Sequence, residues 1–447
     1  MVKQVIFEES HRKYLEKVAV QTKCTAGLIL GHITSNKDYI ASFIRCPSPT
    51  DGENVKQWNG VKDVEGSWVA GHSAQIISSL PGGINIVGVF LIAPTEEAKQ
   101  VSEKLKQIVY QAYKLVSKTF SEVDNYLQDS DESLFWTVMH VDVKNGLVAS
   151  CRQYDVKDNK DIGRPMDLKI VDAPIQWECC QTTLNINKVK SERVLTQCIS
   201  ADIFKSMLKL FQDQVKNAIV TIEQKHRVET DVLNPSSTSN HSAKGSKKKK
   251  PVVKSQSAKT VSCQIFIPTS LQIENPDLYH SLQVCGSITA KAYLPPNSTV
   301  GQAVIALKRD ILQSIHQRIE ILSEDPIDLS GGEQKISVSF PRRVFASNGQ
   351  NETILYSDYI LHDEPLNDCL ERFKDNLDME LQSNELSMEN SFEKFKPERD
   401  CSQGEAIESE MEGIHEGASK TNAVIALVAT AVAFLGWIFS GLVINEN

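Results

Sequence analysis

The spacing of apolar residues along the first 230 positions predicts alternating helices and strands. Apolar side chains recur every three or four residues, as in amphipathic helices, at 8–18, 67–80, 96–120 and 202–223. Short apolar or alternating runs predict strands at 27–33, 39–46, 84–92, 135–141, 147–154 and 176–186. The run 84–92 is almost wholly apolar, which is typical of a strand buried on both faces. Residues 1–230 are therefore expected to form an α/β (α+β) domain, a mixed sheet flanked by helices.

A break in this pattern follows at 231–260, where Lys and Ser dominate and a linker or surface insertion is expected. Beyond it, strand patterns and one strong amphipathic helix return at 281–293, 300–322, 335–345 and 353–361. Pro341 interrupts the third of these segments. Residues 261–374 are predicted to be a second α/β portion, which either stands alone or completes the first domain.

Charge is spread unevenly along the 447 residues. The formal net charge is −9, which argues against general nucleic-acid binding. Residues 363–416 hold 17 Asp or Glu against 5 Lys or Arg. We therefore expect 375–420 to be a disordered acidic tether, with a helix over 366–381 as its alternative start. The basic run Lys247–Lys250 fits a solvated loop, with a nuclear-import or anionic-lipid patch as the alternative.

The segment Ala423–Ile444 contains 22 residues without a charge. As a helix it would be about 33 Å long, enough to cross the hydrocarbon core of a bilayer. Residues 421–447 are thus predicted to be a tail-anchoring transmembrane helix, inserted after translation and leaving the body in the cytosol. Its small residues would allow close helix packing in lipid, although Ala is also common in such spans. The anchor residues of interest are Ala423, Ala429, Ala433, Gly436, Trp437, Ser440 and Ile444.

Three glycosylation sequons provide a test of that topology, because their asparagines should stay bare in the cytosol. They begin at Asn240, Asn297 and Asn351. The ten cysteines include no C-x-x-C pair, so reduced thiols are expected rather than a disulfide framework. The adjacent Cys179 and Cys180 are expected to face opposite sides of one strand.

Familiar catalytic motifs are missing from the sequence. It has no G-x-S-x-G, H-E-x-x-H or G-x-x-x-x-G-K-[ST] segment. Ser330-Gly331-Gly332 fits a turn, and His72 fits a packed or capping histidine better than a metal ligand. We therefore expect no catalytic residue, no metal and no cofactor, which favours a protein that is not an enzyme.

The segment Gly88-Val89-Phe90-Leu91-Ile92-Ala93-Pro94 resembles the strand end of the MPN fold. Active MPN proteases have two zinc-binding histidines there, followed by a serine and an aspartate. In this chain the histidine positions hold Leu91 and Ala93, and the later positions hold Val101 and Lys104. Neither Leu nor Ala has a lone pair for zinc, so this resemblance implies an MPN-like domain at 1–230 that lacks zinc ligands.

The whole chain also resembles the odorant response abnormal family. The shared residues are Gly27-Leu28, Gly31, Lys37-Asp38-Tyr39, Trp68, His72, Ala74-Gln75, Leu80-Pro81-Gly82-Gly83, Gly88-Val89-Phe90, Cys151 to Asp155, Arg164-Pro165, Lys308 to Leu312, Arg343-Val344-Phe345 and Asp358-Tyr359. The resemblance implies an endoplasmic-reticulum membrane protein that supports maturation of seven-helix receptors. It also implies a partner, the ubiquitin-fold-modifier-specific cysteine protease, held through a pair of MPN-like domains. The alternative is a direct receptor chaperone that acts through its transmembrane helix.

Overall fold

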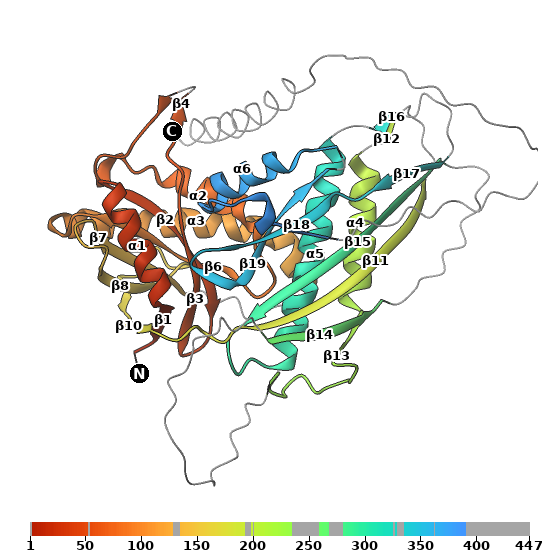
Figure 1. Cartoon of the computed structure of the whole chain (residues 1–447), viewed down its shortest axis with the longest axis horizontal. Helices are drawn as coiled ribbons and strands as arrows, with labels where there is room; N and C mark the ends of the chain where they lie inside the picture. The colour runs from red at the N-terminus through yellow and green to blue at the C-terminus, as the bar shows by residue number, and fades with distance from the viewer. Residues whose placement is uncertain are drawn as a thin grey trace, which may run out of the picture. The chain divides into compact units, whose positions relative to one another are not determined.

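The fold is that of a computed structural model (Figure 1), which describes residues 2–51, 54–127, 135–192, 198–199, 201–234, 259–267, 280–324, 327–328, 335–361 and 363–389. The expected segments Lys247–Lys250, Ser330–Gly332 and Ala423–Ile444 lie outside these residues. Among the described helices, none combines the length and apolar character that crossing a membrane requires.

An eight-stranded mixed sheet forms the first half of the fold, in the order β10-β1-β3-β2-β6-β7-β8-β9. Its strands are β1 (Gln4–Glu8), β2 (Thr25–Ile33), β3 (Lys37–Arg45), β6 (Asn85–Ala93), β7 (Phe135–Asp142), β8 (Val148–Asp155), β9 (Arg164–Pro165) and β10 (Asp167–Val171). The apolar run predicted at 84–92 is β6, which lies inside the sheet between β2 and β7. Its alternate residues enter two different cores, because neighbouring side chains on a strand point to opposite faces.

Three helices cover this sheet. On one face lie α2 (Gly66–Ile76) and α3 (Ala98–Leu127), whose Val69, Val101 and Leu105 join the larger core. The other face packs against α1 (Glu9–Gln21) through Leu15 and Val18. A short hairpin, β4 (Thr50–Asp51) and β5 (Asn54–Val55), stands apart from the large sheet.

A five-stranded sheet, in the order β13-β14-β11-β15-β17, forms the second half. It is built from β11 (Glu178–Glu192), β13 (Ile219–Ile222), β14 (Lys259–Phe266), β15 (His280–Leu294) and β17 (Lys335–Ser339). The long β11 and β15 run antiparallel across Figure 1, beside the neighbouring helices α4 (Ala201–Lys216) and α5 (Val300–Glu324). A two-residue pair links β12 (Cys198–Ile199) with β16 (Ile327–Asp328).

The sheet of β11 and β15 lies between two hydrophobic cores. The first core is the larger one, to which α2 and α3 contribute, and the second lies on the opposite face of this sheet. Cys179 belongs to the first core and Cys180 to the second, which confirms that they face opposite sides of one strand. The first core also contains residues from β18 (Arg342–Asn348), β19 (Asn351–Ile360) and α6 (Leu366–Leu377). The mixed α/β fold is thus confirmed. The two cores do not divide at residue 230, since 178–222 pack with 259–340 while 342–379 complete the first core.

Two local predictions were wrong. The helix predicted at 202–223 ends at Lys216, and the β-branched residues that follow form β13, which pairs with β14. The predicted tether was wrong for residues 375–389, which are packed into the body, whereas the alternative, a helix that starts at 366, is confirmed as α6. Leu377 and Met379 are buried in the first core, and β20 (Ser387–Met388) pairs with β18. Apolar contacts and buried charge pairs outweigh the acidic composition of this stretch.

Candidate functional site

The positions that resemble the zinc site of MPN proteases are filled by apolar side chains. Leu91 and Ala93, at the end of β6, and Val101, on α3, have no exposed surface and belong to one hydrophobic core. Lys104 makes a structural contact, in which its Nζ donates a hydrogen bond to the carbonyl oxygen of Val64 at 2.9 Å. Within the described residues, no cluster of three or more His, Cys, Asp or Glu could hold a metal.

His72 is a packed histidine, as predicted. Its Nε2 hydrogen-bonds the carbonyl oxygen of Asn376 at 2.8 Å and so ties α2 to the end of α6. Burial lowers the pKa of His72 to about 4, although this hydrogen bond opposes the shift. The imidazole is therefore neutral at physiological pH, and its role is to hold two elements together.

A buried charge network joins the two halves of the fold. We call it the interlock and define it as Gly82, Asp310, Arg318, Arg343, Tyr359 and Glu389. The carboxylate of Asp310 accepts two hydrogen bonds from Arg343, at 2.8 and 3.0 Å, and one from the backbone N–H of Gly82 at 3.1 Å. Asp310 and Arg343 are at most 1% exposed. Burial alone would lower the pKa of Arg343, but the adjacent Asp310 carboxylate raises it above its ordinary value.

The second ion pair of the interlock joins Arg318 to Glu389, which are 0% and 1% exposed. Glu389 also accepts a hydrogen bond from the backbone N–H of Arg343 at 2.9 Å. The Arg318 guanidinium lies 5.0 Å from the centre of the Tyr359 ring. Each buried charge therefore has a partner of opposite sign, as burial in a low-dielectric interior requires.

Glycines at the turn before β6 allow the close approach that the interlock needs. A Cβ atom on Gly82 would lie 2.2 Å from the carbonyl oxygen of Ala306 on α5. Gly83 has φ of +79°, and a Cβ there would lie 2.2 Å from the carbonyl oxygen of Tyr293. Turn, helix and strand thus pack backbone against backbone.

Several segments that resemble the odorant response abnormal family meet in the interlock. Leu80–Gly83, Lys308–Leu312, Arg343–Phe345 and Asp358–Tyr359 are far apart in the sequence, yet each supplies one of its residues. Sequence reasoning missed Glu389, which it assigned to the acidic tether. No local pattern marks this glutamate, because its partner Arg318 lies 71 residues earlier.

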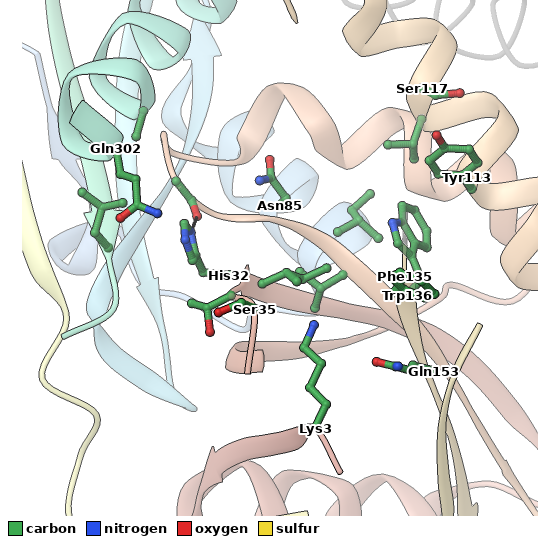
Figure 2. Close-up of a pocket in the computed structure, with 18 of the residues that line it drawn as sticks. Lys3, His32, Ser35, Asn85, Tyr113, Ser117, Phe135, Trp136, Gln153 and Gln302 are labelled. Carbon is green, nitrogen blue, oxygen red and sulfur yellow. Dashed lines mark hydrogen bonds between the residues drawn. The ribbon is translucent and has the colours of Figure 1, made fainter. Parts of the chain in front are cut away.

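A second concave site, which we call the groove, is a cavity of about 1030 Å³ between the two halves (Figure 2). Its walls come from the two residues before β1, the end of β2 with the turn that follows it, β6 with the glycine turn before it, α3, β7, β8, β9, the end of β15 and α5. Figure 2 shows Tyr113 and Gln302 on opposite sides, with Lys3 projecting between them. His32 shapes the inner wall, where its Nδ1 hydrogen-bonds the carbonyl oxygen of Gly83 at 2.7 Å.

The predicted anchor residues Ala423, Ala429, Ala433, Gly436, Trp437, Ser440 and Ile444 all lie outside the described residues. The span therefore stays a prediction. The groove was not predicted, because its lining residues come from nine segments that are far apart in the sequence.

Known proteins resemble this chain over most of its length. Residues 27–388 match the family described as "ODR4-like: Odorant response abnormal 4-like". The chain is 24% identical over 439 residues to the "Protein odr-4 homolog" of Xenopus laevis, which covers 96% of both chains. It is 28% identical over 405 residues to the Mus musculus homologue, covering 87% of this chain and 86% of that one. Among solved structures, UfSP from C. elegans matches with a TM-score of 0.41 and 8% identity, over 85% of this chain and 57% of that one.

Proposed function

The chain belongs to the ODR4-like family, and from this premise we propose that it is a non-catalytic adaptor of the endoplasmic-reticulum membrane. In this proposal, residues 423–444 cross the membrane once and the body lies in the cytosol. The body binds the ubiquitin-fold-modifier-specific cysteine protease and keeps it at the membrane. This activity supports the maturation and trafficking of seven-helix receptors.

The observation that carries the proposal is the uncharged run Ala423–Ile444. A polar backbone group without a partner is costly in lipid, so a segment of this composition is stable there only as a helix. An acidic stretch, which contains 6 Asp or Glu and no Lys or Arg between 400 and 416, separates it from the body. Such a polar connection would leave the body free to meet partners beside the membrane.

The adaptor role is supported by the apolar filling at Leu91, Ala93 and Val101. A domain with zinc-binding side chains would suit hydrolysis, whereas this packing suits a scaffold. The interlock supports the same view, because it fixes both halves of the body into one unit that can present a constant surface. Tethering an enzyme in this way raises its effective concentration near membrane substrates without any new catalytic group.

Affinity capture from a detergent extract tests the partnership directly. A tagged full-length chain should return the modifier-specific protease in near-equal amounts. A variant with Gly82→Trp, which would disrupt the interlock, should lose the protease, while Gly71→Ala, at an open position on α2, should retain it. Capture of the full-length chain without the protease would contradict the proposal.

A direct receptor chaperone is the second candidate, favoured by the small residues Ala429, Ala433 and Gly436 in the span. Replacing 423–444 with a polyleucine helix separates the two candidates. Receptor export that survives the exchange supports tethering, and export that is lost supports direct contact between helices.

The structure sharpens the topology test. Asn351 is 5% exposed and its Nδ2 donates to Glu8 at 3.3 Å, so a missing glycan there says nothing about the compartment. Asn297 is exposed, which makes it the informative sequon among the described residues. We expect Asn297 to stay bare, and a glycan on it would place the body in the lumen.

A further inference from the structure

We propose that one uncovered sheet face in the second half of the fold is the surface that binds the partner protein. We call it the open face and define it by the outward side chains of β13 and β14, which are Ile219, Thr221, Thr260, Ser262, Gln264 and Phe266. Its ligand is an uncharged, partly apolar protein surface. The inference rests on the proposed function, in which this partner is the modifier-specific protease.

The strands β13 and β14 each have one buried face and one open face. Val261 and Cys263 of β14 are buried in the second core, and so is Ile222 of β13. Neighbouring residues on a strand point to opposite faces, so the residues between these point away from that core. None of the hydrophobic cores formed by the described residues includes a side chain of the open face.

The body covers only the neighbouring part of this sheet face. Cys179 of β11 and its cross-strand partner Tyr293 of β15 are buried in the first core. On the same face, Lys291 lies over the Phe345 ring of β18, 4.8 Å from its centre. Beyond these contacts the sheet continues to β14 and to β13 at its edge, and Thr183 of β11 is already exposed (Figure 1). The open face is therefore the part of the sheet that the body leaves uncovered.

The open face carries two large apolar side chains next to each other. Ile219 and Phe266 are cross-strand partners, and they are 59% and 55% exposed. Side chains directly opposite each other on an antiparallel pair are in contact, so the two form one apolar spot. Phe266 is the single aromatic residue among the large hydrophobic side chains that are exposed in the described part of the chain. Aromatic side chains of this kind are common anchors of protein interfaces.

The lack of charge favours a protein partner over a bilayer. None of the six side chains of the open face is charged. The cores of protein–protein interfaces are likewise depleted of charge and rich in aromatic residues. An anionic bilayer surface would instead favour Lys or Arg beside the apolar pair. The hydroxyl and amide groups of the open face can exchange hydrogen bonds with polar groups of a protein surface.

A second edge strand, β10, differs from β13 in the charges beside its apolar residues. Leu168 and Ile170 of β10 are 37% and 44% exposed, but they alternate with Asp167 and Lys169. Charged residues on an edge strand oppose pairing with another chain. β13 is also an edge strand, and its four residues contain no charge. The open face thus lacks the protection that β10 has, which is expected of a surface that a partner covers.

Affinity capture of the tagged full-length chain from a detergent extract tests the open face. The double variant Ile219→Thr with Phe266→Thr removes the apolar pair but keeps residue types that favour strands. We expect it to return about tenfold less protease than the wild type, with an unchanged melting temperature. Phe266→Tyr, which keeps the aromatic ring, should retain the protease. The matched control Leu168→Thr with Ile170→Thr removes two exposed apolar side chains from the other edge strand and should also retain it.

The wild type and the double variant of the open face give failures that can be told apart. A wild type that captures no protease would overturn the proposed function and this inference together. Equal capture by the wild type and the double variant would overturn the inference alone, and weaker binding of that variant to phosphatidylserine vesicles would then assign the face to lipid. Lost capture with a lower melting temperature would also overturn it, because the chain itself would then cover the face. A wild-type dimer that becomes a monomer in the double variant, measured by light scattering, would assign the face to a second copy.

Discussion

The interlock and the groove use the same kinds of side chain to opposite effect. Asp310 and Arg309 are adjacent on α5, yet Asp310 is enclosed by Arg343 and backbone donors while Arg309 lines a cavity. In the interlock every buried charge meets an opposite charge, and the result is a fixed junction. In the groove, Lys3, Arg164 and Arg309 border a cavity, and the described lining includes no Asp or Glu. Adjacent residues of one helix thus close a buried junction on one side and border a cavity on the other.

Removing one partner of the interlock should have the largest effect on stability. Asp310→Ala leaves Arg343 buried without its carboxylate, and we expect a loss of about 3–5 kcal/mol in the free energy of unfolding. Urea denaturation followed by tryptophan fluorescence measures it. Asp310→Leu combined with Arg343→Met, which removes both charges, should recover much of the loss. A single variant as stable as the wild type would show that the junction is held by other contacts.

Acid should weaken the body through its buried histidines. Burial lowers the pKa of His11 and of His72 to about 4, below their ordinary value of 6.5. Their contribution to stability is complete above pH 6.5 and falls as the pH drops from 6.5 towards 4. Each histidine accounts for about 1.4 kcal/mol per pH unit in that window.

Unfolding curves collected at several pH values measure this slope. The variant His72→Gln is compared with the wild type by this slope and not by absolute stability. Its slope should be smaller by about 1.4 kcal/mol per pH unit, which is the contribution of one histidine. An unchanged slope would mean that His72 titrates normally in the folded protein.

A steric clash introduced at the interlock should lower the free energy of unfolding by a moderate amount. Gly82→Ala places a Cβ 2.2 Å from the carbonyl oxygen of Ala306, and overpacking of this kind costs about 1–3 kcal/mol. Gly71, in α2, has no atom within 4 Å of such a Cβ, so Gly71→Ala should leave stability unchanged or raise it. Similar losses in both variants would point to backbone flexibility rather than to a clash.

The smallest change in stability is expected when an exposed ion pair is broken. Lys144 and Glu96 contact each other with side chains 63% and 62% exposed. Water and salt screen such pairs, so the unfolding curve of Lys144→Gln should superpose on that of the wild type. A clear shift would show that burial does not decide which charge pairs stabilise this protein.

The sequence predicts those parts of the fold whose pattern is local. The apolar run that forms β6 and the helical spacing that forms α3 and α5 are visible in single segments. β1 was missed because its few residues directly precede a charged helix, and β10 was missed because its alternation of polar and apolar residues covers only five positions. The end of α4 was missed because β13 follows it after two residues.

Neither site could be assembled from the sequence alone. Asp310 and Arg343 are 33 residues apart, and Arg318 and Glu389 are 71 apart, so no periodic pattern connects them. The groove depends on how nine separate segments of the chain come together in space. By contrast, the apolar identity of Leu91 and Ala93 was readable directly, because a missing zinc ligand is a property of one residue.

Membrane fractionation of cells that express the chain without residues 423–447 tests the adaptor account most directly. The account predicts that the modifier-specific protease moves from the membrane pellet to the soluble fraction while still being captured with the truncated body. A polyleucine span in place of 423–444 should return both to the pellet. A protease that stays in the pellet when those residues are removed, with the body soluble, would contradict the account.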